Sequence, residues 1–491
     1  MVSAVTRGAT RQGAVFVAAI TTYFALQTVL RLWLGGALET DEAEMMVMTP
    51  GLRWGYGPQL PLYNWLQWVL FELFGRDLFA LSLLKNLLLW ATYLFVFIGL
   101  RLFVPAGVAA AGALSLYLIP DVAWEAQRAT THSNMLLFTS AITLAAFLWV
   151  LKTGRWAAYG ALGLAIGLGG LAKYNYWLVP IGLIAAALTL PAFRARVLSP
   201  RLLLSLGIAG LVLAGPYGWM LRNPGLAFSS SGKLAMGTAP GLAEQALDGL
   251  GQLLAGAAIL SVLAVIVGAI VWAVGRGRRA GDPPPPVAAL LLRAGAVVLV
   301  LMAMGVVAAG VGRITPRWLL PLVFLAVPGG AVWLGARMRP RGGVAFAAIL
   351  AVLALAVLTG LGFDRYKDRA RRAVDFTPLP EVLAGVAPQP GTPVVAEFYA
   401  AGNLARLRPD WRIAPYLPFA MREFGGGPVL FVLRENTPET LEQGLREAGW
   451  DDPGDPQILE QGAFTLTFTT SGEAMKMRYY LVDTPGPGGD D

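Results

Sequence analysis

Residues 39–66 read ETDEAEMMVMTPGLRWGYGPQLPLYNWL, and this stretch separates two strongly apolar segments of the chain. Acidic groups so close to a bilayer are costly if desolvated, which indicates a functional site. The second half is rich in glycine, proline and aromatic residues, which interrupt helices and favour the membrane interface. We predict a loop with short helices on the membrane surface, its acids facing a polar pocket; the alternative is a solvated acidic loop. The acids are Glu39, Asp41, Glu42 and Glu44.

The composition of the 491-residue chain is that of a polytopic membrane protein. Hydrophobic residues make up 56% and charged residues 14%, and the mean hydropathy is +0.60, whereas soluble domains carry about 25% charged residues. The net charge of +8 does not indicate nucleic-acid binding, because the basic residues cluster at the ends of apolar runs. The absence of cysteine and the single histidine exclude disulfides, thiol nucleophiles and His-rich metal sites.

Apolar runs long enough to cross hydrocarbon recur along the first three quarters of the chain. With a cytoplasmic N-terminus, the densest arginine clusters fall on the cytoplasmic side, as the positive-inside rule requires. The acidic stretch and a second connection, DVAWEAQRATTHS (121–133), then lie outside. We predict about eleven spans, at residues 14–30, 78–103, 106–119, 135–151, 157–172, 177–193, 202–221, 253–274, 288–311, 318–334 and 344–361.

The composition changes after residue 362, where charge rises and apolar runs shorten. Residues 393–399, 428–434, 464–470 and 477–483 have strand patterns. Residues 438–448 have a helical pattern, with Thr437 as N-cap and Gly449 as C-cap. We therefore predict a membrane domain at 1–362 and a small outer α/β domain at 363–491, whose last seven residues are disordered.

The order and spacing of several motifs resemble those of the GT-C glycosyltransferases, over about residues 10–340. Within them the chain is most similar to glycosyltransferase family 39 and its bacterial relatives, the aminoarabinose, galacturonic-acid and protein mannosyl transferases. The resemblance implies an integral membrane enzyme that moves a sugar, with inversion, from a polyprenyl-phosphate carrier to an acceptor outside the membrane. The motifs are the Asp41-Glu42 pair, GYGPQLPLYNWL (55–66), WEAQRATTHS (124–133), GLGGLAKYNYW (167–177) and RITPRWLLPL (313–322).

By this resemblance, Asp41 occupies the catalytic aspartate position, and we assign Glu42 to the catalytic site beside it. A carboxylate can accept the proton of an acceptor hydroxyl, whereas cations must stabilise the leaving phosphate. We predict that the phosphate is bound by Lys173, Arg313, Arg317 and Arg128. Glu42 or Glu44 could hold a divalent cation, the one cofactor left open. The predicted acceptor- and sugar-binding residues are Glu44, Tyr56, Tyr63, Glu125, His132 and Tyr174.

One departure from the family pattern concerns the second outer connection. Many members have an aspartate at the start of the fourth span, where this chain reads Thr-His-Ser-Asn at 131–134. His132 could hydrogen-bond a sugar or the carrier phosphate, with Glu125 supplying the missing charge; alternatively, interface water satisfies the histidine.

Two other functions remain open from the sequence: a transporter or flippase of lipid-linked glycans, and a glycolipid-binding scaffold. Transporters place polar residues near mid-membrane and often show repeats, whereas the charges here gather on one surface. The leading hypothesis is an enzyme of the bacterial inner membrane with its site and C-terminal domain on the periplasmic side. Its partners would be the lipid-linked sugar donor, membrane lipid, and a glycan, lipid or protein acceptor.

Overall fold

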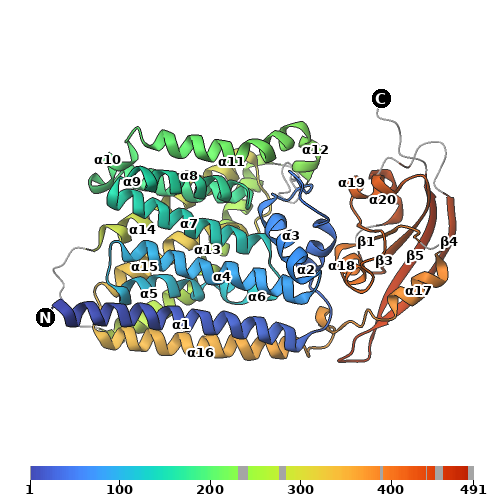
Figure 1. Ribbon diagram of the computed structural model, residues 1–491, viewed down its shortest axis with the longest axis horizontal. Coiled ribbons are helices and arrows are strands. Elements are labelled where there is room, and N and C mark those ends of the chain that lie inside the picture. The colour runs from blue at the N-terminus through green and yellow to red at the C-terminus, as the bar shows by residue number, and fades with distance from the viewer. Residues whose placement is uncertain are drawn as a thin grey trace.

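The computed structural model shows a bundle of long helices with a small sheet at one end, farthest from the N-terminus (Figure 1). It describes residues 2–229, 241–275, 284–387, 391–437, 440–447, 450 and 457–484. The predicted disordered tail and the predicted C-cap Gly449 lie outside these ranges.

Eight helices of the described chain are long and apolar enough to cross a membrane. Their exposure differs: α16 presents most of its apolar surface outward, whereas α7 is largely buried between its neighbours. Since lipid solvates apolar side chains, outward-facing leucine and valine cost nothing here. The eight are α1 (Val2–Leu34), α4 (Leu78–Arg101), α7 (His132–Thr153), α11 (Leu202–Arg222), α13 (Leu242–Gly275), α14 (Pro286–Ala309), η5–α15 (Pro316–Leu319, Leu320–Gly335) and α16 (Pro340–Asp364).

The predicted count of eleven spans is not confirmed by helix length. Two of the three remaining predicted spans correspond to the shorter apolar helices α8 (Trp156–Gly170) and α9 (Leu178–Leu188). The third is a broken element: α5 (Ala106–Leu114) and η1 (Ser115–Leu118) meet η2 (Asp121–Glu125) and α6 (Ala126–Arg128) at a bend of 82°. Pro120 lies at this bend, where it cannot donate a backbone hydrogen bond.

The acidic stretch forms two short helices, α2 (Thr40–Met48) and α3 (Leu62–Phe74), at the end of the bundle that faces the sheet (Figure 1). The α2 helix begins after Glu39, whose backbone N–H donates to the Glu42 carboxylate at 3.1 Å. A glutamate side chain that accepts the backbone N–H of the residue three positions earlier is a typical signal for the start of a helix. The glycine- and proline-rich segment between the helices continues neither of them.

The C-terminal sheet has the strand order β2-β1-β3-β5-β4. Strand β1 runs parallel to its neighbours β2 and the central strand β3, whereas β5 is antiparallel to β3 and β4. The helices α17 (Leu379–Val386), α18 (Phe398–Leu407), α19 (Pro418–Met421) and α20 (Leu441–Glu447) complete this part. The strands are β1 (Val394–Ala396), β2 (Ile413–Pro415), β3 (Gly427–Arg434), β4 (Gln457–Thr467) and β5 (Ala474–Thr484).

The α/β character of this part is confirmed, but three local predictions were wrong. The strand predicted at 393–399 ends at Ala396, and Phe398 already begins α18. The strand predicted at 464–470 is β4, which starts earlier and ends at Thr467. The predicted N-cap Thr437 is not the cap: helix α20 begins at Leu441, and the Thr440 hydroxyl accepts the backbone N–H of Gln443 at 3.2 Å.

Helix α18 packs closely against α2. A Cβ on Gly402 would lie 2.2 Å from the Ala43 carbonyl oxygen, so only glycine allows this approach. The adjacent Asn403 amide accepts the Leu38 N–H at 2.8 Å and donates to the Leu38 carbonyl at 3.3 Å. The C-terminal part therefore fixes the chain just before the acidic helix.

Candidate functional site

Two aspartates and two cations from distant parts of the chain interact electrostatically at the end of the bundle beside the sheet. Asp41 lies in the first turn of α2, Asp121 begins η2, Lys173 joins α8 to η3 (Tyr174–Trp177), and Arg317 lies in η5. The charges of Lys173 and Arg317 act on both carboxylates. Lys173 immediately precedes η3, and Arg317 lies within η5, so each cation is in a short segment between longer helices.

Asp41 is the carboxylate that the surrounding structure leaves unengaged. It is mostly buried, and it makes no hydrogen bond with another described residue. Burial raises its pKa above the ordinary 3.8, an effect that Arg317, Lys173 and Lys85 partly offset. A partly accessible carboxylate with a raised pKa and a free hydrogen-bonding capacity is suited to accept a proton from a bound hydroxyl.

Lys173 lies next to the chain's single histidine. Its ammonium donates to the Ser133 hydroxyl at 2.9 Å, and its charge acts on the His132 ring. The His132 ring lies 5.3 Å from that of Tyr63. The Tyr63 hydroxyl and both His132 nitrogens are buried without a hydrogen-bond partner among the described residues. Unpaired buried polar atoms cost free energy, so these atoms are available to a ligand or to water.

Glu42 is buried in an ion-pair network on another side of α2. Its carboxylate accepts from Arg31 Nη2 at 2.7 Å and from Lys85 Nζ at 3.0 Å, and all three side chains are almost fully buried. Burial alone would raise the Glu42 pKa, but Arg31, Lys85 and Arg372 hold it well below the ordinary value. Both of its oxygens are therefore occupied, and the network fixes the orientation of the helix that bears Asp41.

A second ion-pair cluster connects the C-terminal part to the outer connections. Glu39 lies 3.7 Å from Arg372 Nε and 3.9 Å from Arg128 Nη1, and Arg128 Nη2 binds Glu125 at 3.1 Å. The predicted phosphate ligand Arg128 and the predicted sugar ligand Glu125 are thus paired with each other.

The remaining predicted residues lie apart from the two aspartates or have other contacts. The Tyr56 hydroxyl donates to the Gly51 carbonyl, and the Tyr174 hydroxyl donates to that of Ala227 at 2.9 Å. Glu44 accepts the Gln59 amide at 3.2 Å and remains partly exposed. Arg313 is exposed and forms no ion pair with a described residue. Arg317, four residues later, is the cation that reaches the site.

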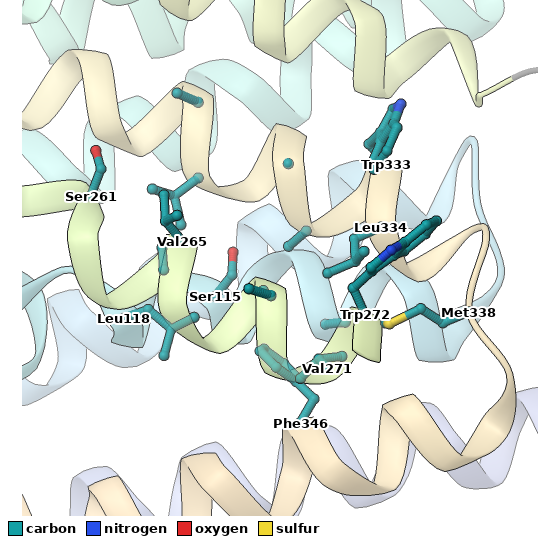
Figure 2. Close-up of a pocket in the computed structure, with 18 residues that line it drawn as sticks. Ser115, Leu118, Ser261, Val265, Val271, Trp272, Trp333, Leu334, Met338 and Phe346 are labelled. Atoms are coloured by element: carbon teal, nitrogen blue, oxygen red, sulfur yellow. The ribbon is translucent and has the colours of Figure 1, made fainter. Parts of the chain in front are cut away.

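A partly open apolar cavity of about 660 Å³ is bounded by α5, η1, α13, α15 and the start of α16 (Figure 2). Leu118, at one end of the lining, is three residues before Asp121. On α13, Gly256 packs against Leu319 of η5, and Ser261 of the lining is five residues further on. The cavity therefore extends away from the charged site into the apolar part of the bundle, with Trp272 and Trp333 at its other end (Figure 2).

Known proteins are similar to this chain in sequence and in fold. Residues 57–219 match the family described as dolichyl-phosphate-mannose-protein mannosyltransferase. Over 442 residues the chain is 33% identical to the lipopolysaccharide core galacturonosyltransferase RgtA of Rhizobium johnstonii, covering 84% of this chain and 85% of that protein. This chain belongs to the GT-C glycosyltransferases. Its identity to RgtB of the same organism, also a lipopolysaccharide core galacturonosyltransferase, is 32% over 408 residues, covering 79% and 80% of the two chains.

The glycosyltransferase has the fold of a solved relative. The crystal structure of ArnT from Cupriavidus metallidurans, bound to undecaprenyl phosphate, superimposes with a TM-score of 0.57. The match covers 97% of this chain and 99% of ArnT at 15% identity, a similarity that shows the fold alone. The predicted family and fold class are thus confirmed, and the glycosyltransferase is a multi-pass membrane enzyme.

Asp121 is the site residue that the sequence reasoning missed. The sequence lacks the family's second aspartate at 131–134 and predicts that Glu125 supplies its charge, whereas in the structure the cations that act on Asp41 also act on Asp121. The available signal was Pro120, which ends an apolar run immediately before an acid. The bend at this proline turns Asp121 toward the end of the bundle, which a straight span would not do.

The charged site of this glycosyltransferase does not fit a metal ion. Within the described residues, no three histidine or acidic side chains are grouped closely enough to hold one. Asp41 and Asp121 face an ammonium and a guanidinium, which already provide the positive charge that a divalent cation would bring.

Proposed function

We propose that the glycosyltransferase moves a sugar from a polyprenyl-phosphate carrier to an envelope glycan of the lipopolysaccharide-core type. The observation that supports this most directly is the Asp41 carboxylate, which makes no hydrogen bond with a described residue and is affected by the charges of Lys173 and Arg317, at the end of a bundle that has a partly open apolar cavity. A donor of this class needs such a combination, since its tail is apolar, its phosphate is anionic and its acceptor hydroxyl must lose a proton.

The reaction can be written from these residues. Asp41 accepts the proton of the acceptor hydroxyl while that oxygen bonds to the anomeric carbon. The bond from the anomeric carbon to the phosphate oxygen breaks on the opposite face, so the configuration inverts. The electron pair stays with the polyprenyl phosphate, whose charge Lys173 and Arg317 stabilise. The unpaired Tyr63 and His132 groups are available to the sugar, and Asp121 orients the acceptor or donor from the second outer connection.

The other predicted residues have structural roles in this proposal. Glu42 holds α2 through Arg31 and Lys85, while Arg128 and Glu125 stabilise the second outer connection. We place residues 1–362 in the membrane domain that performs the chemistry and residues 363–491 in an outer domain that covers it.

The same proposal places the site on the periplasmic side of the inner membrane. Helix α10 (Pro191–Val197) lies at the end of the bundle opposite the sheet (Figure 1), and its last turn carries Arg194 and Arg196. A basic cluster is expected on the cytoplasmic side, so the sheet and Asp41 would lie outside. A transporter is less well supported, because the charged site is at one end of the bundle and the relatives are named as transferases.

Lys173→Ala and Arg317→Ala variants test the assignment of the phosphate site. Each removes a cation that acts on Asp41, so we expect a roughly tenfold or larger loss of affinity for undecaprenyl phosphate. Binding is measured on the purified protein in nanodiscs, and transfer of galacturonic acid from its polyprenyl phosphate to lipopolysaccharide core is followed by mass spectrometry. Arg313→Ala, an exposed cation four residues from Arg317, is the matched control. Unchanged binding in both site variants contradicts the proposal.

The pH dependence tests Asp41 as the base. Its pKa is raised, so the carboxylate takes up its proton at a higher pH than an ordinary aspartate does. Only the ionised form accepts a proton, and kcat/KM should therefore fall tenfold per pH unit below a midpoint that lies above pH 3.8. The measurement is initial rate against pH at subsaturating donor. A midpoint at or below 3.8, with the protein still folded, would contradict this role.

A further inference from the structure

A second cavity, of about 700 Å³, lies between the first outer loop, the outer end of α11 and the C-terminal sheet. Its walls include residues 53–57 of the loop, Trp219 and Asn223 at the end of α11, and residues 411–415 leading into and along β2. The cavity therefore exists only because the membrane part and the C-terminal part are docked together. Pockets at such junctions are common ligand sites.

Aromatic rings form much of this cavity, and glycines hold them close to the backbone. A Cβ on Gly55 would lie 2.0 Å from the Trp219 ring, and one on Gly57 would lie 2.8 Å from Phe419. Gly57 also has a φ of +64°, which favours glycine. The walls are therefore preformed surfaces of rigid side chains. The aromatic lining residues are Trp54, Tyr56, Trp219, Trp411, Phe419 and Phe424.

Two guanidinium groups line the same cavity. Arg53 lies 3.8 Å from Glu423, with both side chains more than half exposed, and Arg412 lies over the Phe424 ring at 4.9 Å. An exposed pair at this distance is weak and easily exchanged for a ligand. Arginine matches carboxylate and phosphate geometry through paired N–H groups, and flat rings bind the apolar faces of sugars. The lining is thus complementary to a saccharide with anionic groups.

One face of α2 connects this cavity to the proposed base. Asp41, Glu44 and Met48 are spaced i, i+3 and i+7, so they lie on the same side of the helix. Met48 lines the cavity, and Asp41 faces Lys173 and Arg317. Seven residues of helix span about 10 Å. An extended saccharide can therefore occupy the cavity while its reacting end lies beside Asp41, and the partly exposed Glu44 lies between the two.

Exposed apolar and aromatic side chains near the cavity are those expected at a membrane interface. Leu52 and Trp54 at the loop tip are 58% and 59% exposed, and Leu221 at the end of α11 is 82% exposed. Exposed apolar and aromatic side chains at the end of a span are typical of contact with lipid headgroups. A saccharide attached to a lipid in the same leaflet would enter the cavity without leaving the membrane surface.

We propose that this junction cavity binds the anionic oligosaccharide head of the acceptor glycolipid, away from the sugar that receives the new residue. The inference rests on the proposed transfer reaction and names the subsite that selects its acceptor. The rings of Trp54 and Trp219 hold the sugar faces, and Arg412 together with Arg53 holds the carboxylate or phosphate groups. The C-terminal part thereby contributes to specificity without touching the reacting atoms.

Arg412→Ala and Trp54→Ala test the subsite. Both side chains are exposed, so the fold tolerates their loss. We expect KM for lipopolysaccharide core to rise about tenfold in each variant, with kcat and the affinity for undecaprenyl phosphate unchanged. Trp33→Ala, which removes another exposed tryptophan at the end of α1, should leave all three unchanged. An unchanged acceptor KM in both cavity variants, or a loss of donor affinity instead, overturns the proposal.

A binding measurement without donor separates this inference from the transfer reaction. Delipidated acidic core oligosaccharide is titrated into the full-length protein in nanodiscs, and tryptophan fluorescence is followed. Saturable binding that Arg412→Ala weakens about tenfold supports the subsite, whether or not sugar is transferred. Such binding without any transfer would overturn the proposed reaction and leave the subsite supported. Transfer by the wild type combined with no oligosaccharide binding would overturn the subsite alone. Neutral dextran of similar length is the control, since it lacks the groups that the arginines bind.

Discussion

We expect that replacing Asp41 with asparagine abolishes sugar transfer and leaves a folded protein that still binds the lipid carrier. Asparagine has nearly the same shape but cannot accept the proton, and loss of a positioned base costs about 10²- to 10⁴-fold in rate. Transfer is measured as the initial rate of product formation at saturating donor and acceptor. Because Asp41 has no hydrogen bond with another described residue, no structural contact of that kind is broken.

The charge change gives this prediction a second readout. The raised pKa of Asp41 means that ionising it costs more in the folded than in the unfolded protein, so at neutral pH the asparagine variant should be at least as stable as the wild type. With the carboxylate gone, Lys173 and Arg317 face one negative charge fewer, and undecaprenyl phosphate should bind as tightly or more tightly.

Glu44→Gln is the matched control for Asp41→Asn, because it removes the neighbouring partly exposed carboxylate on the same face of α2. We expect its rate of transfer to change far less than that of Asp41→Asn. Transfer by Asp41→Asn within tenfold of the wild-type rate would contradict the base assignment. A lower unfolding temperature together with lost carrier binding would show that Asp41 has a structural role instead.

Replacing Glu42 with glutamine should destabilise the protein more than any other conservative change in the acidic stretch. The change leaves the Arg31 and Lys85 charges buried without their shared carboxylate. Breaking a buried ion pair by removing one partner costs about 3–5 kcal/mol. Thermal unfolding of the purified variant, followed by intrinsic fluorescence, measures this loss. Activity should fall as well, because α2 then no longer holds Asp41 in place.

The pH dependence of that stability difference identifies its cause. The pKa of Glu42 is depressed well below the ordinary 4.5, so its stabilising contribution is fully present above pH 4.5 and is lost as the pH falls through the depressed value. The gap in unfolding temperature between the wild type and Glu42→Gln should therefore narrow only in strong acid. An equal gap at all pH values, or no gap at neutral pH, would show that the ion pairs do not hold α2.

The two neighbouring acids thus have opposite expected behaviour, which the sequence could not distinguish. Asp41 and Glu42 are adjacent, and both were assigned to the catalytic site. Successive residues of a helix point about 100° apart, so one faces the charged site and the other faces Arg31 and Lys85. The packing of α2 against α4 and α18 decides which of the two acids faces the charged site and which faces Arg31 and Lys85.

The membrane architecture and the family followed from the sequence itself. Apolar runs of about 18 residues or more mark spans because a helix of that length crosses the hydrocarbon without leaving backbone groups unpaired. The sequence analysis counts α8, α9 and the element broken at Pro120 among its eleven spans, but the length criterion does not confirm them, because α8 and α9 are short and the third element is bent by 82°.

Only the tertiary structure shows which of the candidate residues lie at the charged site. Arg317 reaches the aspartates while Arg313 remains exposed, although both are isolated arginines on one connection. Glu39 pairs with Arg372, more than 300 residues away, and the charges of Lys173 and Arg317 act on both Asp121 and Asp41. A local pattern specifies which side chains are charged and roughly at which end of a helix they lie. Whether a charge meets a partner, a substrate or solvent depends on helix rotation and packing, which no stretch of the sequence determines alone.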